Sequence, residues 1–178
     1  MSIESIVGAN MILSATANYG TVSAAGTVLN YTAPANFCGT DTVNVIVEDG
    51  NGSTEDIIVT FDVDDLPIAV NDSFTNTGVS QTLDVLNLGT ADHDPASCDM
   101  IRLVSAGKNG TDATTEQGGT VSINNNGTIN DLSDDFIDYT PNGVNIDSFQ
   151  YIISDINGNL DTAIAYMFLG AEICGNSI

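Results

Sequence analysis

The chain has almost no basic residues. Only Arg102 and Lys108 stand against 24 acidic residues, and the formal net charge of the 178-residue chain is -22. Because neutralising phosphates requires lysine and arginine, this balance excludes ordinary nucleic-acid binding and argues against docking on anionic lipid headgroups. A charge of this sign attracts cations, and 19 of the acids are aspartates, whose short side chains suit hard cations. The alternative is that surface acids simply aid solubility.

Other scarce features exclude further classes of protein. There is no tryptophan and only 6% of the residues are aromatic, which weakens a sugar-stacking platform. Walker, zincin and Gly-x-Ser-x-Gly motifs are missing, so we expect no enzyme. The single histidine, His93, has no second histidine or suitably spaced cysteine beside it and is expected to be a loop residue. No stretch reaches the ~18 apolar residues of a membrane span, so direct membrane insertion is not expected.

Cysteines and the N-terminal sequence bear on the compartment. The three cysteines, Cys38, Cys98 and Cys174, show no metal-binding Cys-x-x-Cys spacing. Either they are free buried thiols, or Cys38 pairs with Cys98 while Cys174 pairs outside this segment. The first residues lack the features of a signal peptide, yet a composition rich in Thr, Asn, Asp and Gly is typical of extracellular proteins. We therefore expect a piece of a longer extracellular, cell-surface protein.

The second half of the sequence repeats the first. Gly20-Thr21-Val22-Ser23 returns as Gly119-Thr120-Val121-Ser122, and Tyr31-Thr32 returns as Tyr139-Thr140. A pair of aspartates eight residues apart also recurs: Asp41 and Asp49 in the first copy, and Asp147 and Asp155 in the second. A repeat of roughly 100 residues is the size of an independent domain.

Strand signals dominate both copies. Residues 42–47 and 57–63 are β-branched and flank a Gly-Asn-Gly turn, and residues 149–153 and 163–168 form the matching pair, so each pair predicts a hairpin. Short strands separated by Gly/Asn turns predict an all-β fold of tandem antiparallel β-sandwich domains.

The sequence also predicts the domain borders. We expect a partial first repeat over residues 1–66, a complete second repeat over 67–172, and a tail or the start of a next unit over 173–178. The front of the second repeat, residues 69–87, has no obvious counterpart before Met11. Either the chain was cut there, or a neighbouring segment or another copy supplies the missing strands, as in donor-strand filaments.

Several ordered motifs carry a family resemblance. Pro67-Ile68-Ala69-Val70-Asn71-Asp72 is followed by Asp84-Val85-Leu86-Asn87, Asp92-His93-Asp94-Pro95 and Tyr139-Thr140-Pro141, and then by Asp-Ser-Phe-x-Tyr ending at Tyr151. This order resembles the cadherin-like, Ig-like tandem repeat of giant bacterial surface adhesins. Cys38-Gly39-Thr40-Asp41 is similar to repeats in gliding and adhesive surface proteins of the Bacteroidetes type. The resemblance implies an Ig/cadherin-like sandwich and calcium that stiffens the array.

Calcium requires six to eight oxygen ligands, and the sequence offers a cluster of aspartates around the border between the repeats. Asp49 lies in a turn that could reach this border, and the Asp-x-Asp-Pro loop could join in the folded chain. The predicted ligands are Asp49, Asp62, Asp64, Asp65, Asp72, Asp92 and Asp94. A solvated acidic linker is the alternative. Residues 155–161 resemble part of an EF-hand loop but lack its frame, so a hairpin turn is favoured there.

Together these features predict a structural repeat of a long extracellular adhesin or filament, with neighbouring repeats or identical subunits as partners. A recognition module for a glycan or surface is one alternative, with the irregular residues 107–119 as its site. The other alternative is an accessory domain of a secreted hydrolase.

Overall fold

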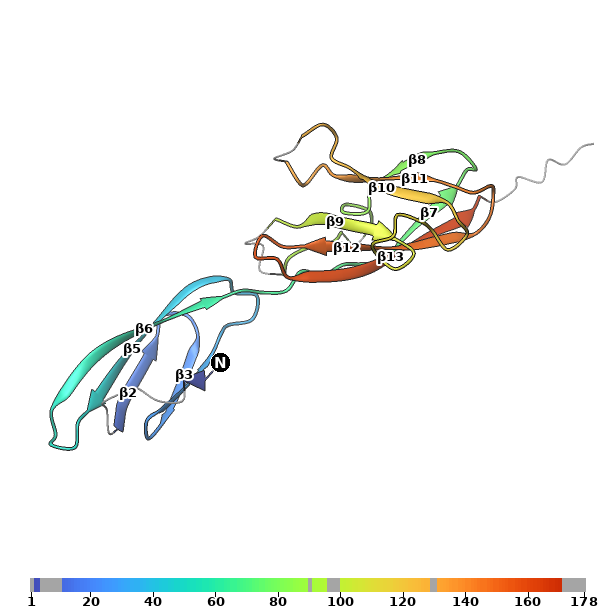
Figure 1. The fold of residues 1–178 in the computed structure, drawn as a ribbon. Helices are drawn as coiled ribbons and strands as arrows, with labels where there is room; N and C mark the ends of the chain where they lie inside the picture. The colour runs from blue at the N-terminus through green and yellow to red at the C-terminus, as the bar shows by residue number, and fades with distance from the viewer. Residues whose placement is uncertain (1, 4–10, 90, 96–99, 129–130, 171–178) are drawn as a thin grey trace, which may run out of the picture. The chain divides into compact units, whose positions relative to one another are not determined.

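The computed structural model describes residues 2–3, 11–89, 91–95, 100–128 and 131–170. Every regular secondary-structure element in these ranges is a β-strand, which confirms the predicted all-β fold (Figure 1). Two compact units divide the chain, Met1–Asp65 and Leu66–Ile178. The predicted tail over 173–178 lies outside the described residues. No helix in the described ranges has the length and apolar character needed to cross a bilayer.

The first unit contains two three-stranded sheets. One has the order β1-β4-β3 and the other the order β2-β5-β6. The strands are β1 (Ser2–Ile3), β2 (Met11–Ala17), β3 (Thr21–Ala25), β4 (Val28–Thr32), β5 (Gly39–Glu48) and β6 (Thr54–Val63).

The second unit pairs a three-stranded sheet, β10-β11-β8, with a four-stranded sheet, β7-β13-β12-β9. Its strands are β7 (Asp72–Asn76), β8 (Gln81–Leu83), β9 (Arg102–Gly107), β10 (Thr120–Asn124), β11 (Phe136–Thr140), β12 (Asp147–Ser154) and β13 (Leu160–Leu169). All pairings are antiparallel except that of β7 with β13.

The predicted hairpins are confirmed in both units. β5 pairs with β6 and β12 pairs with β13, each antiparallel and each through a short Asn-Gly turn. Along β5 the odd-numbered side chains from Asp41 to Val47 are buried and the residues between them are more exposed. This period of two is what the alternation in the sequence indicates for a strand with one face on a core.

The two units share their strand order with one exception. Sheet β3-β4-β1 corresponds to β10-β11-β8, and β2-β5-β6 corresponds to β9-β12-β13. Only β7 has no counterpart among the described residues of the first unit. The prediction that the whole front of the repeat lacks a counterpart before Met11 is therefore wrong in part, because β1 pairs with β4 as β8 pairs with β11.

Each unit has its own hydrophobic core. In the second unit the largest fully buried side chains are Tyr139, Tyr151 and Phe149. In the first unit, Tyr31 stacks on Phe61 with ring centroids 4.2 Å apart. Full burial of such a side chain stabilises the fold by about 1.5–3 kcal/mol.

A tyrosine–aspartate pair recurs in both cores. The Tyr31 hydroxyl donates to Asp41 Oδ2 at 2.9 Å, and the Tyr139 hydroxyl donates to Asp147 Oδ2 at 3.0 Å. Asp41 is fully buried and also accepts the N–H of Gly20 at 2.7 Å. Burial acts to raise the pKa of Asp41, but the hydrogen bonds from Gly20 and Tyr31 lower it overall. The repeated Tyr-Thr and Asp motifs are thus explained by the fold.

The repeated Gly-Thr-Val motif has a steric cause. A Cβ on Gly20 would lie 2.7 Å from the Thr32 carbonyl oxygen, and a Cβ on Gly119 would lie 2.7 Å from the Thr140 carbonyl oxygen. No side chain fits at either place without moving backbone. Glycine is therefore required where the following strand begins in each unit.

The cysteine alternatives are partly resolved. Cys38 is disulfide-bonded, so the interpretation of this residue as a free thiol is wrong. Cys98 and Cys174 lie outside the described residues.

Candidate functional site

Three of the predicted cation ligands lie in the second unit, and all three are buried. Asp72 begins β7, while Asp92 and Asp94 lie in the loop between β8 and β9; their exposed fractions are 5%, 6% and 6%. The Ile68 N–H donates to the His93 carbonyl at 2.8 Å, and the His93 N–H donates to the Ile68 carbonyl at 3.1 Å. This short bridge holds the aspartate loop against the segment that leads into β7.

The Tyr151 hydroxyl joins two of these carboxylates. It lies 2.6 Å from the Val70 carbonyl oxygen, 3.0 Å from Asp72 Oδ2 and 3.3 Å from Asp92 Oδ1. The Val70 N–H donates to Asp92 Oδ1 at 2.6 Å. A hydroxyl has one hydrogen, so it can satisfy only one of its three acceptors at a time. The cluster therefore has an excess of acceptors that a proton or a cation would relieve.

Both carboxylates have perturbed acidity. Burial raises the pKa of Asp72 to about 6, and repulsion from Asp92 acts in the same direction. Burial also raises the pKa of Asp92 to about 6, with the charge of Asp161 adding to the effect. Asp92 Oδ2 is buried and has no hydrogen-bond partner in the described part of the chain. Such an oxygen beside a second carboxylate is costly unless positive charge compensates it.

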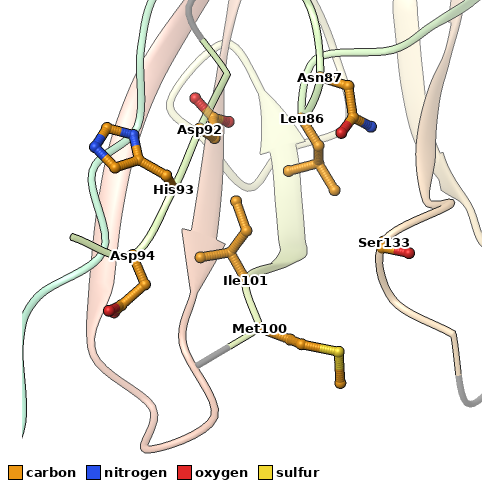
Figure 2. A pocket seen from close by; sticks show the side chains of 8 residues that line it. All are labelled: Leu86, Asn87, Asp92, His93, Asp94, Met100, Ile101 and Ser133. Atoms are coloured by element: carbon orange, nitrogen blue, oxygen red, sulfur yellow. The ribbon is translucent and has the colours of Figure 1, made fainter. Parts of the chain in front are cut away.

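A cavity of about 280 Å³ lies beside the aspartate loop (Figure 2). It is lined by Leu86, Asn87, Asp92, His93, Asp94, Met100, Ile101 and Ser133. Its polar groups include carboxylate, amide and hydroxyl oxygens, the ligand class that calcium prefers. Over the described ranges no three His, Cys, Asp or Glu side chains gather as a metal site. Calcium here would therefore take further ligands from carbonyl oxygens and water.

His93 is a loop residue, as its sequence context predicts. Its side chain is exposed and projects away from Asp92 (Figure 2). The ring Nδ1 lies 3.1 Å from the Ala91 carbonyl oxygen. Its structural role comes from its backbone, which forms the bridge to Ile68.

The other four predicted ligands belong to the first unit. Asp49 lies in the β5–β6 turn, where its carboxylate accepts the N–H groups of Ser53 at 2.9 Å and Asn51 at 2.8 Å, and these bonds lower its pKa. Asp62, which accepts the Thr40 hydroxyl at 2.8 Å, lies near the other end of β6. At about 3.3 Å per residue the strand separates the two by roughly 25 Å. The prediction that Asp49 reaches the border cluster is therefore wrong.

Asp64 and Asp65 follow β6; Asp64 is exposed and Asp65 is half-buried. Their participation in a cation site, and that of Asp62, stays a prediction.

The Asp155 segment forms a hairpin turn, as predicted. Asp155 is fully buried, and its carboxylate accepts the Asn159 N–H at 2.9 Å and the Asn159 side-chain amide at 2.8 Å. The turn joins β12 to β13. Through these hydrogen bonds the Asp155 carboxylate stabilises the turn.

Residues 107–119, the site of the alternative recognition function, are tied to the core of the second unit. The Thr115 hydroxyl donates to Asp147 Oδ2 at 2.6 Å, and the Gln117 N–H donates to Asp147 Oδ1 at 2.9 Å. The Glu116 N–H donates to the Ser148 carbonyl at 2.9 Å. The loop completes the environment of Asp147 and so belongs to the framework of the domain.

The sequence predictions do not include two buried side chains, Tyr151 and Asp135. Tyr151 links Asp72 to Asp92, and its signal in the sequence is its place in Asp-Ser-Phe-x-Tyr, two residues after the inward-facing Phe149. Asp135 is 4% exposed, and burial together with the charges of its neighbours raises its pKa. It lies in a run of acids whose pattern gives no sign of which one is buried.

One known protein family matches both units. A family model described as bacterial Ig domain matches residues 3–62 and, a second time, residues 64–167. The two matches together span most of the chain. A search of curated proteins gives no match.

Proposed function

The chain belongs to the bacterial Ig domain family, and from this membership we propose that it is a structural segment of a long extracellular bacterial surface protein, an adhesin or a filament. Domains of this family are structural repeat modules, typically non-catalytic and commonly found at the cell surface. In this proposal the task of the segment is mechanical, and its partners are neighbouring repeats or identical subunits.

The observation that supports the proposal is that the repeated residues form buried hydrogen bonds inside each unit. The pairs Tyr31–Asp41 and Tyr139–Asp147 are buried, hydrogen-bonded and equivalent in the two units. What the duplication has kept is thus the internal framework of the domain. A chain built by copying a framework suits reach and spacing. The ordered motifs support the cadherin-like, Bacteroidetes-type class of surface repeat within this proposal.

We also propose that calcium binds the second unit through Asp72, Asp92 and Asp94. The support is the pair of buried carboxylates around one hydroxyl, with the unpartnered Asp92 Oδ2 and the adjoining cavity. Bound calcium would supply the positive charge that this cluster lacks. It would also hold the β8–β9 loop against the start of β7 and so reduce the freedom of the loop.

Labelling of cells tests the location. Antibodies against the purified chain should label intact cells of the source bacterium, and cells from which the gene is deleted are the matched control. Labelling that requires permeabilised cells would contradict the proposal.

Single-molecule pulling tests the mechanical role. Under reducing conditions the full chain should show two unfolding events. With matched segments of residues 3–62 and 64–167, the length gained should be on the order of 20 and 35 nm. Extension at negligible force, without separate events, would contradict a load-bearing segment.

A further inference from the structure

The outward face of the larger sheet in the second unit is uncharged along three neighbouring strands, β7, β13 and β12. Successive side chains of a strand point to opposite faces, so the residues between the buried ones point outward. The even-numbered residues from Thr162 to Phe168 on β13 and from Ser148 to Ile152 on β12 point outward, and none is charged. The outward residues of β7 at positions 73 and 75 are also uncharged. In a chain with a net charge of -22 this face is therefore unusual.

Two aromatic rings lie on this face. Tyr166 and Phe168 are two residues apart on β13, and their rings are nearly parallel, with centroids 6.1 Å apart. Phe168 is 48% exposed and Tyr166 is half-buried. Thr75 on β7 lies opposite Phe168. Ser73 on β7 and Ser148 on β12 lie on the two sides of Tyr166. Apolar ring surface thus lies beside side-chain hydroxyls.

The first unit has the same hairpin but lacks this surface. The β5–β6 hairpin matches the β12–β13 hairpin when Asp41 is aligned with Asp147, because each aspartate lies opposite the residue 20 positions later. In this alignment Thr60 and Asp62 take the places of the two rings. Asp56 adds a second acid to the same outward face. The rings are therefore not part of the framework that the two units share.

The loop over residues 107–119 lies against one side of this face. A Cβ on Gly110 would lie 3.0 Å from Ile152 Cδ1, so the loop packs on the outward side of β12. The Glu116 N–H donates to the Ser148 carbonyl at 2.9 Å. Lys108 and Glu116 of this loop form an ion pair at 3.1 Å and so balance each other's charge. The loop thus borders the two rings on the β12 side without adding net charge from this pair.

We propose that Tyr166 and Phe168, with Ser73, Thr75 and Ser148 beside them, form an aromatic strip that binds a neutral oligosaccharide. The C–H face of a sugar ring packs on an aromatic ring, and the sugar hydroxyls exchange hydrogen bonds with serine and threonine. Other β folds bind oligosaccharides with a sheet face and its flanking loops. The inference concerns a second task of the domain and depends neither on the mechanical role nor on calcium.

Charge and area select this class of ligand. The net charge of -22 repels anionic polymers, and the outward positions of the three strands hold no carboxylate for a basic ligand. Three strands about 4.8 Å apart, over seven residues of about 3.3 Å each, cover roughly 300 Å². A stable protein–protein interface buries about 800 Å² on each partner. The aromatic strip is therefore too small for a second copy or another protein, and it suits a few sugar rings.

A titration of the isotope-labelled full chain tests the proposal. The probes are neutral tetrasaccharides of glucose, of mannose and of N-acetylglucosamine, with tetragalacturonate as the anionic control. At least one neutral tetrasaccharide should shift the NMR signals of the Tyr166 and Phe168 rings and of the Thr75 methyl group, and tetragalacturonate should not. The proposal is overturned if no neutral tetrasaccharide shifts these signals at tens of millimolar, or if tetragalacturonate shifts them equally.

Three alanine variants locate the binding. Tyr166→Ala and Phe168→Ala should each weaken the binding of the sugar at least about tenfold. Tyr19→Ala removes a tyrosine of the first unit that is 64% exposed, and it should leave the affinity unchanged. Equal losses in all three variants would contradict binding at the aromatic strip. The ring signals of the unaltered chain serve as the measurement if a variant fails to fold.

A second copy of the chain on the aromatic strip would give a different result. The signals of Tyr166 and Phe168 would then move as the concentration of the chain rises without any sugar, and sedimentation would show a dimer. That result would overturn the proposal, because the face would then be an interface between copies.

Discussion

At the scale of single residues, the repeated motifs are buried hydrogen-bonded groups. Tyr139→Phe removes the hydroxyl that donates to Asp147 and leaves a buried acceptor short of one partner. We expect the second unit to lose about 1–3 kcal/mol of unfolding free energy, measured by denaturant titration. The control is Tyr166→Phe, at a half-buried tyrosine of β13. Equal losses in the two variants would show that the pair with Asp147 does not matter.

The acidity of Asp92 gives a second prediction. Its folded-state pKa of about 6 lies above the ordinary value, so between about pH 4 and 6 the folded unit binds more protons than the unfolded chain. The stability of the unit therefore falls as pH rises through this window. Asp92→Asn imitates the protonated form and should raise the melting temperature at pH 7 in EDTA, but not near pH 4. Asp56→Asn makes the same charge change at an exposed site and is the control.

At the scale of elements, the loop over residues 107–119 should contribute to stability. Thr115 is 2% exposed, and its hydroxyl donates to Asp147 while accepting the Gly119 N–H at 2.8 Å. Thr115→Val should cost the second unit about 1–3 kcal/mol. Thr111→Val in the same loop is exposed and should stay within about 0.5 kcal/mol of the unaltered chain. Calorimetry measures the stability of both variants. If Thr115→Val leaves the stability of the second unit unchanged, a structural role of the loop is contradicted and a recognition role is favoured.

The elements that the sequence predicts well are those with local signals. Alternating β-branched residues and Asn-Gly turns identify both long hairpins, and the order of motifs identifies the sandwich. The parallel pairing of β7 with β13 leaves no such signal, because its partners are about 90 residues apart. The same limit applies to predicting the cation ligands from the sequence. Spacing in the sequence groups Asp49 with Asp62, whereas the length of β6 separates them, and only the folded chain brings Tyr151 to Asp72 and Asp92.

At the scale of the whole molecule, the two units should respond differently to calcium. The buried carboxylate cluster lies in the second unit, so calcium should raise the melting temperature of that unit and leave the first unchanged. At a free concentration of about 100 times Kd the gain is about 2.7 kcal/mol, or at least about 10 °C for a domain of this size. Calorimetry of the full chain in calcium and in EDTA measures the shift, and Tyr139→Phe identifies the transition of the second unit.

Paired substitutions decide where the calcium binds. Asp72→Asn combined with Asp92→Asn should abolish the calcium-dependent rise, because the substitutions remove the charges that a cation would balance. Asp62→Asn combined with Asp64→Asn makes the same charge change in the first unit and should preserve the rise. If the first-unit substitutions abolish the calcium-dependent rise instead, calcium binding depends on Asp62 and Asp64. Protons alone would then compensate the negative charge of Asp72 and Asp92 around Tyr151. The pH dependence of the second unit would then persist in calcium, whereas a cation bound at Asp72 and Asp92 should weaken it, since binding favours the deprotonated carboxylates.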